Sequence, residues 1–244
     1  MIDIITPSGD RPLQFSLCKE WMKKQDFTDK VHWIVADDSV HGYYDTSGMP
    51  DNWEITHLKI KRDSEPKSST QAENLLLALN HIKYDKIAMI EDDDYYASDW
   101  LSLCSTVLNN FNMFGIKNLL YYNMSNRTWV YKKYRNTNND SNPMYSTAFN
   151  KKFVEALKYI CKENTDRLDN LLWLQKDSYY LMDCNIPSAI GIKGLPGRPS
   201  MNMGAKHRSS LGNDDQNFNM LKTFIGEYSF SKYKETFNDL FKEI

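Results

Sequence analysis

Hydrophobic and polar positions follow two different rhythms along the first hundred residues. Apolar runs with the length of buried strands lie at residues 2–5, 31–36, 53–60 and 86–90. Between them, segments 12–25 and 69–82 repeat apolar residues every three to four positions, which predicts amphipathic helices. Strands that alternate with helices predict an α/β fold, in which helices flank a mixed, mostly parallel sheet.

The second half of the chain has a less regular pattern. Residues 117–124 and 128–134 predict two strands that could pair, and 184–192 predict another. Helices are predicted at 149–163, 165–176, 213–227 and 231–244. A loop rich in glycine, proline and basic residues follows at 193–210. Because no internal repeat and no clean linker interrupts the chain, we expect one domain spanning residues 1–244.

Composition excludes some classes of protein. With 244 residues, of which 41% are hydrophobic and 25% charged, the chain is typical of a soluble globular protein. Thirty basic against thirty-two acidic residues leave a formal charge of −2, which gives no overall electrostatic case for nucleic-acid binding. The four cysteines are far apart and form no CxxC pair, which argues against a zinc site or a disulfide framework.

The same sequence predicts a cytoplasmic protein. The first residues lack the basic and long apolar regions of a signal peptide. Apolar stretches stay below the roughly 20 residues that cross a bilayer, so no integral membrane association is expected.

Polar residues gather where the predicted strands end. They are Thr6, Pro7, Ser8, Asp10 and Arg11 after the first strand, Asp37 and Asp38 after the second, and Glu91, Asp92, Asp93 and Asp94 after residues 86–90. The carboxyl ends of parallel strands meet at one edge of a sheet, where α/β proteins bind their ligands. The three groups therefore predict one site.

The acidic run Glu91–Asp94 points to a bound cation. Neighbouring carboxylates repel, and each raises the pKa of the next, so we expect a positive partner. Ser98 and Asp99 could cap a following helix in a solvated loop, but this does not explain four acids before them. A calcium loop does not fit, because it would spread its ligands over about a dozen residues, whereas these four acids are consecutive. Magnesium or manganese needs one or two carboxylates together with phosphates and water, which suits a short acidic motif at a strand end.

Four stretches resemble a known family. "AMIEDDDYYASDWL" at 88–101 resembles the DxD region of GT-A glycosyltransferases, notably the inverting family two, which has an E-D-D version of this motif. Residues 3–12 and 31–39 resemble the first strand with its nucleotide loop and the second strand of that family. "DNLLWL" at 169–174 resembles the late motif that carries the catalytic base. Here Leu168 precedes Asp169, where the family usually has an acidic pair.

The resemblance implies a GT-A fold and a metal-dependent glycosyltransferase that uses a nucleotide sugar, with a UDP-sugar favoured. It also implies that the reaction inverts the anomeric configuration of the transferred sugar. Residues 1–115 would form the nucleotide-sugar-binding half, and 116–244 the acceptor-binding and catalytic half. The cofactor would be Mn²⁺ or Mg²⁺, a divalent ion that neutralises the leaving diphosphate.

It also implies roles for individual residues. Asp93 and Asp94 would bind the metal, and His207 would complete its shell. Asp169 would be the base, with Asp166 as the second choice. The donor-binding set would be Thr6, Pro7, Arg11, Asp37, Asp38, Glu91, Asp92, Lys193, Arg198 and Lys206. The last three belong to a basic loop, residues 193–208, which we expect to close over the diphosphate.

Two other functions stay open at this stage. A sugar nucleotidyltransferase would also need acidic metal ligands, but a glycine-rich basic loop is expected after its first strand, and "TPSGDRP" has one glycine and one arginine. A non-catalytic nucleotide-sugar-binding module would lack a working base. The acceptor is open too: a glycan, a hydroxylated small molecule or, through the aromatic and basic run at 128–135, a hydroxylated base in viral DNA.

Overall fold

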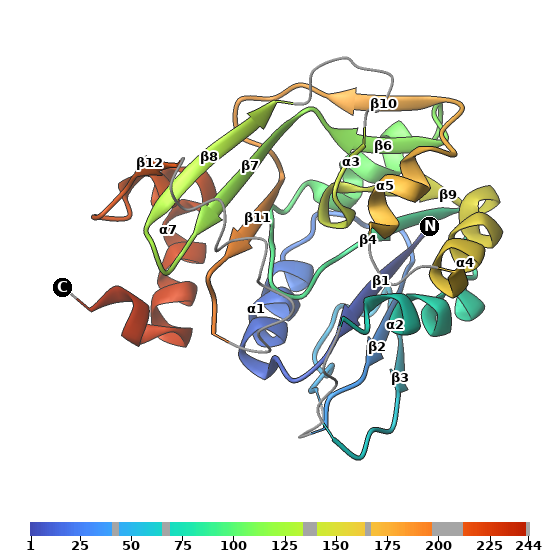
Figure 1. The fold of residues 1–244 in the computed structure, drawn as a ribbon, viewed down its shortest axis with the longest axis horizontal. Helices are drawn as coiled ribbons and strands as arrows, with labels where there is room; N and C mark the ends of the chain where they lie inside the picture. Colours follow the sequence, from blue (N-terminus) through green and yellow to red (C-terminus); the bar gives the residue numbers. More distant parts are fainter. Residues whose placement is uncertain (41–43, 65–68, 134–140, 164–166, 197–211, 243–244) are drawn as a thin grey trace.

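A computed structural model describes residues 1–40, 44–64, 69–133, 141–163, 167–196 and 212–242. Its described strands form two sheets, one of seven strands in the order β10-β6-β9-β4-β1-β2-β3 and one of five in the order β12-β8-β7-β11-β5. Helices flank the larger sheet, as Figure 1 shows. The α/β fold expected from the sequence is confirmed.

The first half builds the parallel part of the larger sheet. Its strands are β1 (Ile2–Ser8), β2 (Val31–Asp37), β3 (Trp53–Lys59) and β4 (Lys86–Met89). Strands β2, β1 and β4 lie side by side and β3 lies outside β2, all parallel. Every residue of β1 and β2 is buried. This explains why both strands are mainly apolar, because such strands have protein on both faces; the buried polar residues Asp3 and His32 pair with each other.

Two helices cover opposite faces of these strands. They are α1 (Pro12–Lys23), between β1 and β2, and α2 (Gln71–Ala78), between β3 and β4. Side chains of α1 pack with Ile4 and Trp33, whereas those of α2 pack with Ile5 and Ile34. Successive strand residues point to opposite faces, so each strand serves both cores. Leu13, which the helical pattern assigned to the buried side of α1, is 49% exposed.

Strand order reverses at β1. The chain moves outward from β1 to β2 and β3, and α2 then carries it back to β4 on the other side of β1. A crevice forms at such a reversal, beyond the carboxyl ends of the two strands. These ends are Ser8 and Met89.

The second half completes the larger sheet with three strands that the sequence pattern did not reveal. They are β6 (Met113–Ile116), β9 (Ala148–Asn150) and β10 (Tyr179–Met182). Strand β9 is antiparallel to both β4 and β6. The helix predicted from residue 149 is wrong over its first residues, where β9 is followed by a 3₁₀ turn and α4 (Val154–Glu163) begins later.

The smaller sheet contains the predicted pair. Its strands are β5 (Tyr95–Tyr96), β7 (Asn118–Asn123), β8 (Thr128–Lys133), β11 (Ala189–Lys193) and β12 (Asn213–Asp214). Strands β7 and β8 form the expected antiparallel hairpin. Because β4 belongs to one sheet and β5 to the other, the acidic run between them lies where the two sheets join.

The remaining helices are α3 (Trp100–Val107), α5 (Leu168–Trp173) and α7 (Asn219–Thr236). The two helical segments predicted at the end of the chain meet in α7, which lies beside β12 and β8 in Figure 1. Gly226 inside it has a φ of 77°, so the helix is kinked there. None of the helices in the described ranges is both long and apolar enough to span a bilayer.

Candidate active site

The acidic run Glu91–Asp94 lies at the reversal of the strand order, just after β4. Its residues follow β4 and precede β5, and three of them, Asp92, Asp93 and Asp94, are at most 5% exposed. Three carboxylates at one strand end are held away from water, so each needs a compensating partner.

Arg11 supplies the first counter-charge. Its Nη2 lies 2.5 Å from Oδ1 of Asp92, and its Nη1 lies 2.8 Å from Oδ2 of Asp93. The guanidinium is 3% exposed and bridges the two carboxylates. Ser8 Oγ also donates a hydrogen bond to Asp92. The positive partner expected for the acidic run is thus partly built into the chain; the donor contact predicted for Arg11 stays a prediction.

Lys193 supplies the second counter-charge. Oδ1 of Asp94 accepts the backbone N–H of Ile192 at 2.7 Å and lies 3.1 Å from Lys193 Nζ. Both partners come from β11, so Asp94 ties the acidic run to the smaller sheet. Its other oxygen, Oδ2, is buried and has no hydrogen-bond partner among the described residues. An unsatisfied carboxylate oxygen in this position is available to a bound cation.

Burial raises the pKa of three acids of the run. Burial raises the pKa of Asp92 to about 7, with the charge of Arg11 opposing the rise and those of Asp93 and Glu91 adding to it. Burial also raises the pKa of Glu91 and of Asp94, although Lys193 opposes both shifts. Additional positive charge would favour the ionised carboxylates.

The acidic run fits a divalent metal of the magnesium type. Asp93 and Asp94 each keep one oxygen outside the contacts described above. No three His, Cys, Asp or Glu side chains converge as a complete site in the ranges that the structure describes. Mg²⁺ or Mn²⁺ takes one or two carboxylates and completes its shell with phosphates and water, so the two uncommitted oxygens would suffice to hold it. His207, the predicted third ligand, lies outside the described residues.

Asp169 lies within electrostatic reach of the acidic run. It belongs to the first turn of α5, where it is half-buried, and the helix packs on the core through Leu168, Leu172 and Trp173. The charge of Asp169 contributes to raising the pKa of Glu91. Burial raises the pKa of Asp169 itself, although the backbone N–H groups nearby and Lys132 oppose the shift. The alternative base, Asp166, lies outside the described residues.

The two acids after the second strand are already paired. Asp37 lies 2.9 Å from Lys59 Nζ, and Asp38 lies 2.8 Å from Arg62 Nε. Both carboxylates are fully buried. Burial acts to raise the pKa of Asp37, but hydrogen bonds from His57, Ser39 and Lys59 outweigh it and lower the pKa to about 2. These pairs give Asp37 and Asp38 a structural role. The nucleoside contacts predicted for the two acids stay predictions.

The depressed pKa of Asp37 predicts a loss of stability in acid. Because the folded pKa of about 2 lies below the ordinary aspartate pKa of 3.8, the stabilisation is complete above pH 4 and disappears as pH falls toward 2. We expect the free energy of unfolding to lose about 2 kcal/mol over this window. In Asp37→Asn the same window should be flatter, as measured by urea unfolding across the pH range in which the protein folds.

The exposed Asp63→Asn variant is the control and should follow the wild type. A difference between wild type and Asp37→Asn that stays constant from pH 6 to pH 2 would contradict the assignment.

Thr6 and Pro7 lie inside β1, which extends beyond the predicted run to Ser8. The hydroxyl of Thr6 accepts a hydrogen bond from Trp33 Nε1 at 2.9 Å. Pro7 is tolerated here because the β4 ladder pairs only with residues 3–5, so no strand bond needs its missing N–H. Their predicted donor contacts stay predictions.

Two polar residues of α2 that the sequence did not single out also face this edge. Gln71 Nε2 donates to Oε1 of Glu91 at 2.7 Å, and Asn74 Nδ2 donates to the carbonyl of Ser8 at 3.0 Å. Asn74 is fully buried. A polar residue on the apolar face of the predicted helix is the signal that could have revealed it.

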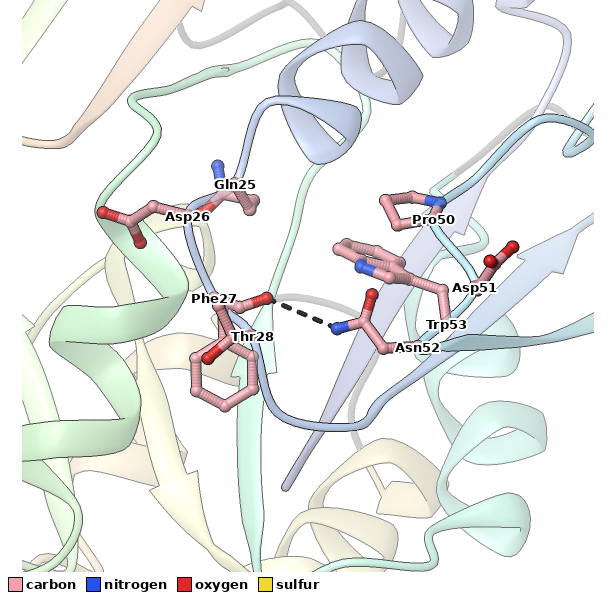
Figure 2. Close-up of a pocket in the computed structure, with 8 residues that line it drawn as sticks. All are labelled: Gln25, Asp26, Phe27, Thr28, Pro50, Asp51, Asn52 and Trp53. Atoms are coloured by element: carbon pink, nitrogen blue, oxygen red, sulfur yellow. Dashed lines mark hydrogen bonds between the residues drawn. The ribbon is translucent and has the colours of Figure 1, made fainter.

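A separate pocket lies at the opposite ends of the strands of the larger sheet. Figure 2 shows this pocket of about 560 Å³, lined by Gln25, Asp26, Phe27, Thr28, Pro50, Asp51, Asn52 and Trp53. Trp53 is the first residue of β3, so the pocket lies at the amino ends of the strands. It is therefore separate from the acidic run.

Most of the predicted basic loop falls outside the described residues. Lys193 is the last residue of β11, whereas Arg198 and Lys206 lie in the range 197–211, which the structure does not describe. The expected closure of residues 193–208 over a donor stays a prediction.

Comparison with known proteins reveals a shared fold and no sequence relative. No family model and no curated protein matches the chain. Among solved structures, S. aureus TarS matches 78% of this chain with a TM-score of 0.55 and 10% identity, and the match covers 36% of TarS. TarS 1-349 matches 96% of this chain with a TM-score of 0.54 and 12% identity, over 72% of its length.

A structure of TarS 1-349 in complex with UDP-GlcNAc is similar over the same shares of both chains, with a TM-score of 0.51 and 10% identity. The chain therefore shares the fold of S. aureus TarS, in agreement with the GT-A fold that the sequence motifs implied.

Proposed function

We propose that the protein is a metal-dependent, inverting glycosyltransferase that moves a sugar from a nucleotide sugar to a hydroxyl group. The observation that carries the proposal is the acidic run at the strand reversal, with a buried unpaired oxygen on Asp94 and with Asp169 in electrostatic reach. A metal-anchoring carboxylate and a separate base are what this reaction requires.

Asp93 and Asp94 would hold the divalent cation. When bound, the ion supplies positive charge to the diphosphate that leaves the sugar. The uncommitted carboxylate oxygens and the raised pKa of Asp94 support this role, since both indicate a site that lacks positive charge. Lys193, beside Asp94, would add a second positive charge for the same diphosphate.

Asp169 would act as the base. The acceptor oxygen attacks the anomeric carbon, the bond from that carbon to the diphosphate oxygen breaks, and the proton of the acceptor moves to a carboxylate oxygen of Asp169. Such a single displacement inverts the anomeric centre. The burial that raises the pKa of Asp169 makes its carboxylate a stronger base, which supports the assignment.

The favoured donor is a UDP-sugar. TarS, whose fold the chain shares, has been solved with UDP-GlcNAc and with UDP. Residues 1–115 would bind the nucleotide, because they contain β1, β2 and the acidic run. Residues 116–244 would bind the acceptor and provide the base.

The acceptor would be a glycan or a hydroxylated small molecule, with a hydroxylated base in viral DNA as the alternative. Lys132 of β8 acts electrostatically on Asp169, which supports an acceptor-binding role for the hairpin formed by β7 and β8. Strand β8 contributes the half-buried Trp129 and Tyr131 and the exposed Lys132, which could contact the acceptor.

Calorimetry with UDP tests the donor and metal parts together. We expect UDP to bind at least about tenfold more tightly with MnCl₂ than with EDTA, because the ion and the diphosphate share the acidic run. GDP, which differs from UDP only in its nucleobase, serves as the matched control for nucleobase preference. Equal UDP affinity under both conditions would contradict the metal role.

A second measurement separates an enzyme from a binding module. A panel of UDP-sugars is incubated with the protein and Mn²⁺, and free UDP is measured. Slow release of UDP is expected from a transferase that uses water in place of its acceptor. Tight binding without release would favour a non-catalytic module, and release of UTP on addition of pyrophosphate would favour a nucleotidyltransferase.

A further inference from the structure

Arg11 lies against two of the carboxylates at which a metal ion would be expected to bind. Its two Nη atoms form ion pairs with Asp92 and Asp93, while its Nε–H is buried without a hydrogen-bond partner among the described residues. The side chain is thus placed by the two carboxylates and not by a full set of partners.

The four acids differ in how firmly they are tied. Asp92 also accepts a hydrogen bond from Ser8, Glu91 accepts one from Gln71, and Asp94 accepts one from the backbone of Ile192. Asp93 has no second partner besides Arg11 in the described part of the chain. The contact between Arg11 and Asp93 is therefore the one that can open with the least rearrangement of the fold.

We propose that Arg11 is an internal counter-cation that competes with the divalent metal for the acidic run and so weakens metal binding when no donor is present. The inference rests on the proposed function, because it assumes that Asp93 belongs to the metal site. A guanidinium on one oxygen of Asp93 and a divalent ion on the other repel each other in a buried site, so each weakens the binding of the other.

A Mn²⁺ titration in the absence of nucleotide tests the proposal. Free Mn²⁺ is measured by electron paramagnetic resonance at one fixed pH for the wild type and for Arg11→Gln. We expect Arg11→Gln to bind Mn²⁺ at least about tenfold more tightly than the wild type, because a nearby positive charge has been removed. An Arg11 with a purely structural role would leave Mn²⁺ affinity equal or lower it.

The matched control is Arg62→Gln. Arg62 pairs with the buried Asp38 at the same edge of the sheet and is not in an ion pair with the acidic run. Its loss should change Mn²⁺ affinity by less than about threefold. A gain as large as that of Arg11→Gln would mean a general charge effect and would overturn the specific role of Arg11.

Arg11→Lys keeps the test decisive if Arg11→Gln does not fold. A lysine retains the charge but lacks the planar fork that bridges two carboxylates, so Mn²⁺ affinity should rise by about threefold. Circular dichroism checks folding of each variant. Unchanged or weaker Mn²⁺ binding in a folded Arg11 variant would overturn the proposal.

Measuring UDP binding in EDTA together with Mn²⁺ binding distinguishes failure of the competition from failure of the proposed function. If the wild type binds UDP and Mn²⁺ but the Arg11 variants gain no Mn²⁺ affinity, only the competition is refuted. If neither the wild type nor the Arg11 variants bind Mn²⁺, with or without UDP, the metal site itself is refuted and the competition falls with it.

Discussion

Replacing Asp169 by asparagine is expected to lower turnover by about a hundred- to ten-thousand-fold while UDP affinity stays within about threefold. The amide has nearly the same shape but cannot take the proton of the acceptor. Asp169 lies on α5, outside the two strands and the acidic run that would bind the nucleotide. The loss should therefore be confined to the chemical step.

Steady-state kinetics with saturating donor and calorimetry with UDP measure the two parts of this prediction. The control is Asp177→Asn, which removes an exposed acid after α5 that pairs with Lys152. It should leave turnover within about twofold of the wild type. If turnover survives in Asp169→Asn and fails in Asp166→Asn, the other acid is the base.

The anomeric configuration of the product gives an independent check on the mechanism. A single displacement with a carboxylate base predicts inversion. A product that keeps the configuration of the donor would contradict this mechanism, whichever acid is required.

Replacing Asp93 by asparagine is expected to abolish the part of UDP affinity that depends on Mn²⁺ and to lower turnover at least about a hundredfold. The uncommitted oxygen of Asp93 loses its charge, and the remaining carboxylate on Asp94 is shared with Lys193. Arg11 keeps its ion pair with Asp92, so the fold should survive. Calorimetry of UDP with MnCl₂ and with EDTA measures the difference directly.

The matched control is Asp99→Asn, which changes an acid in the same stretch that precedes α3 and lies beyond β5. This variant should keep the full response of UDP binding to Mn²⁺. A normal Mn²⁺ response in Asp93→Asn, or a lost response in Asp99→Asn, would show that the wrong end of the acidic stretch was assigned.

The fold of the first half of the chain could be predicted from sequence because its signals are local. In β1 and β2 every position is buried, so the strands are mainly apolar, and α1 and α2 show the helical repeat. The carboxyl ends of parallel strands meet at one edge whatever the details of packing. The acidic run could therefore be assigned to a ligand site before its surroundings were known.

The tertiary structure alone decided which short segments became strands. Strands β5, β9 and β12 have only two or three residues, too few to show a period of two. Their conformation is set by the neighbours with which they pair, as when Ala148 and Phe149 fit between β4 and β6. Local pattern cannot supply such information.

Some properties of the site follow from the sequence, and others follow only from the tertiary structure. The sequence by itself determined that four acids follow β4 and that they need positive partners, because repulsion between adjacent carboxylates depends only on their spacing. Only the folded chain decided that these partners include Arg11 and Lys193, which lie about 80 and 100 residues away along the chain. It also brought Asp169 within electrostatic reach of Glu91, since α5 packs through its apolar side chains and carries the acid with it. Contacts of this kind depend on distances between elements, which the sequence pattern does not encode locally.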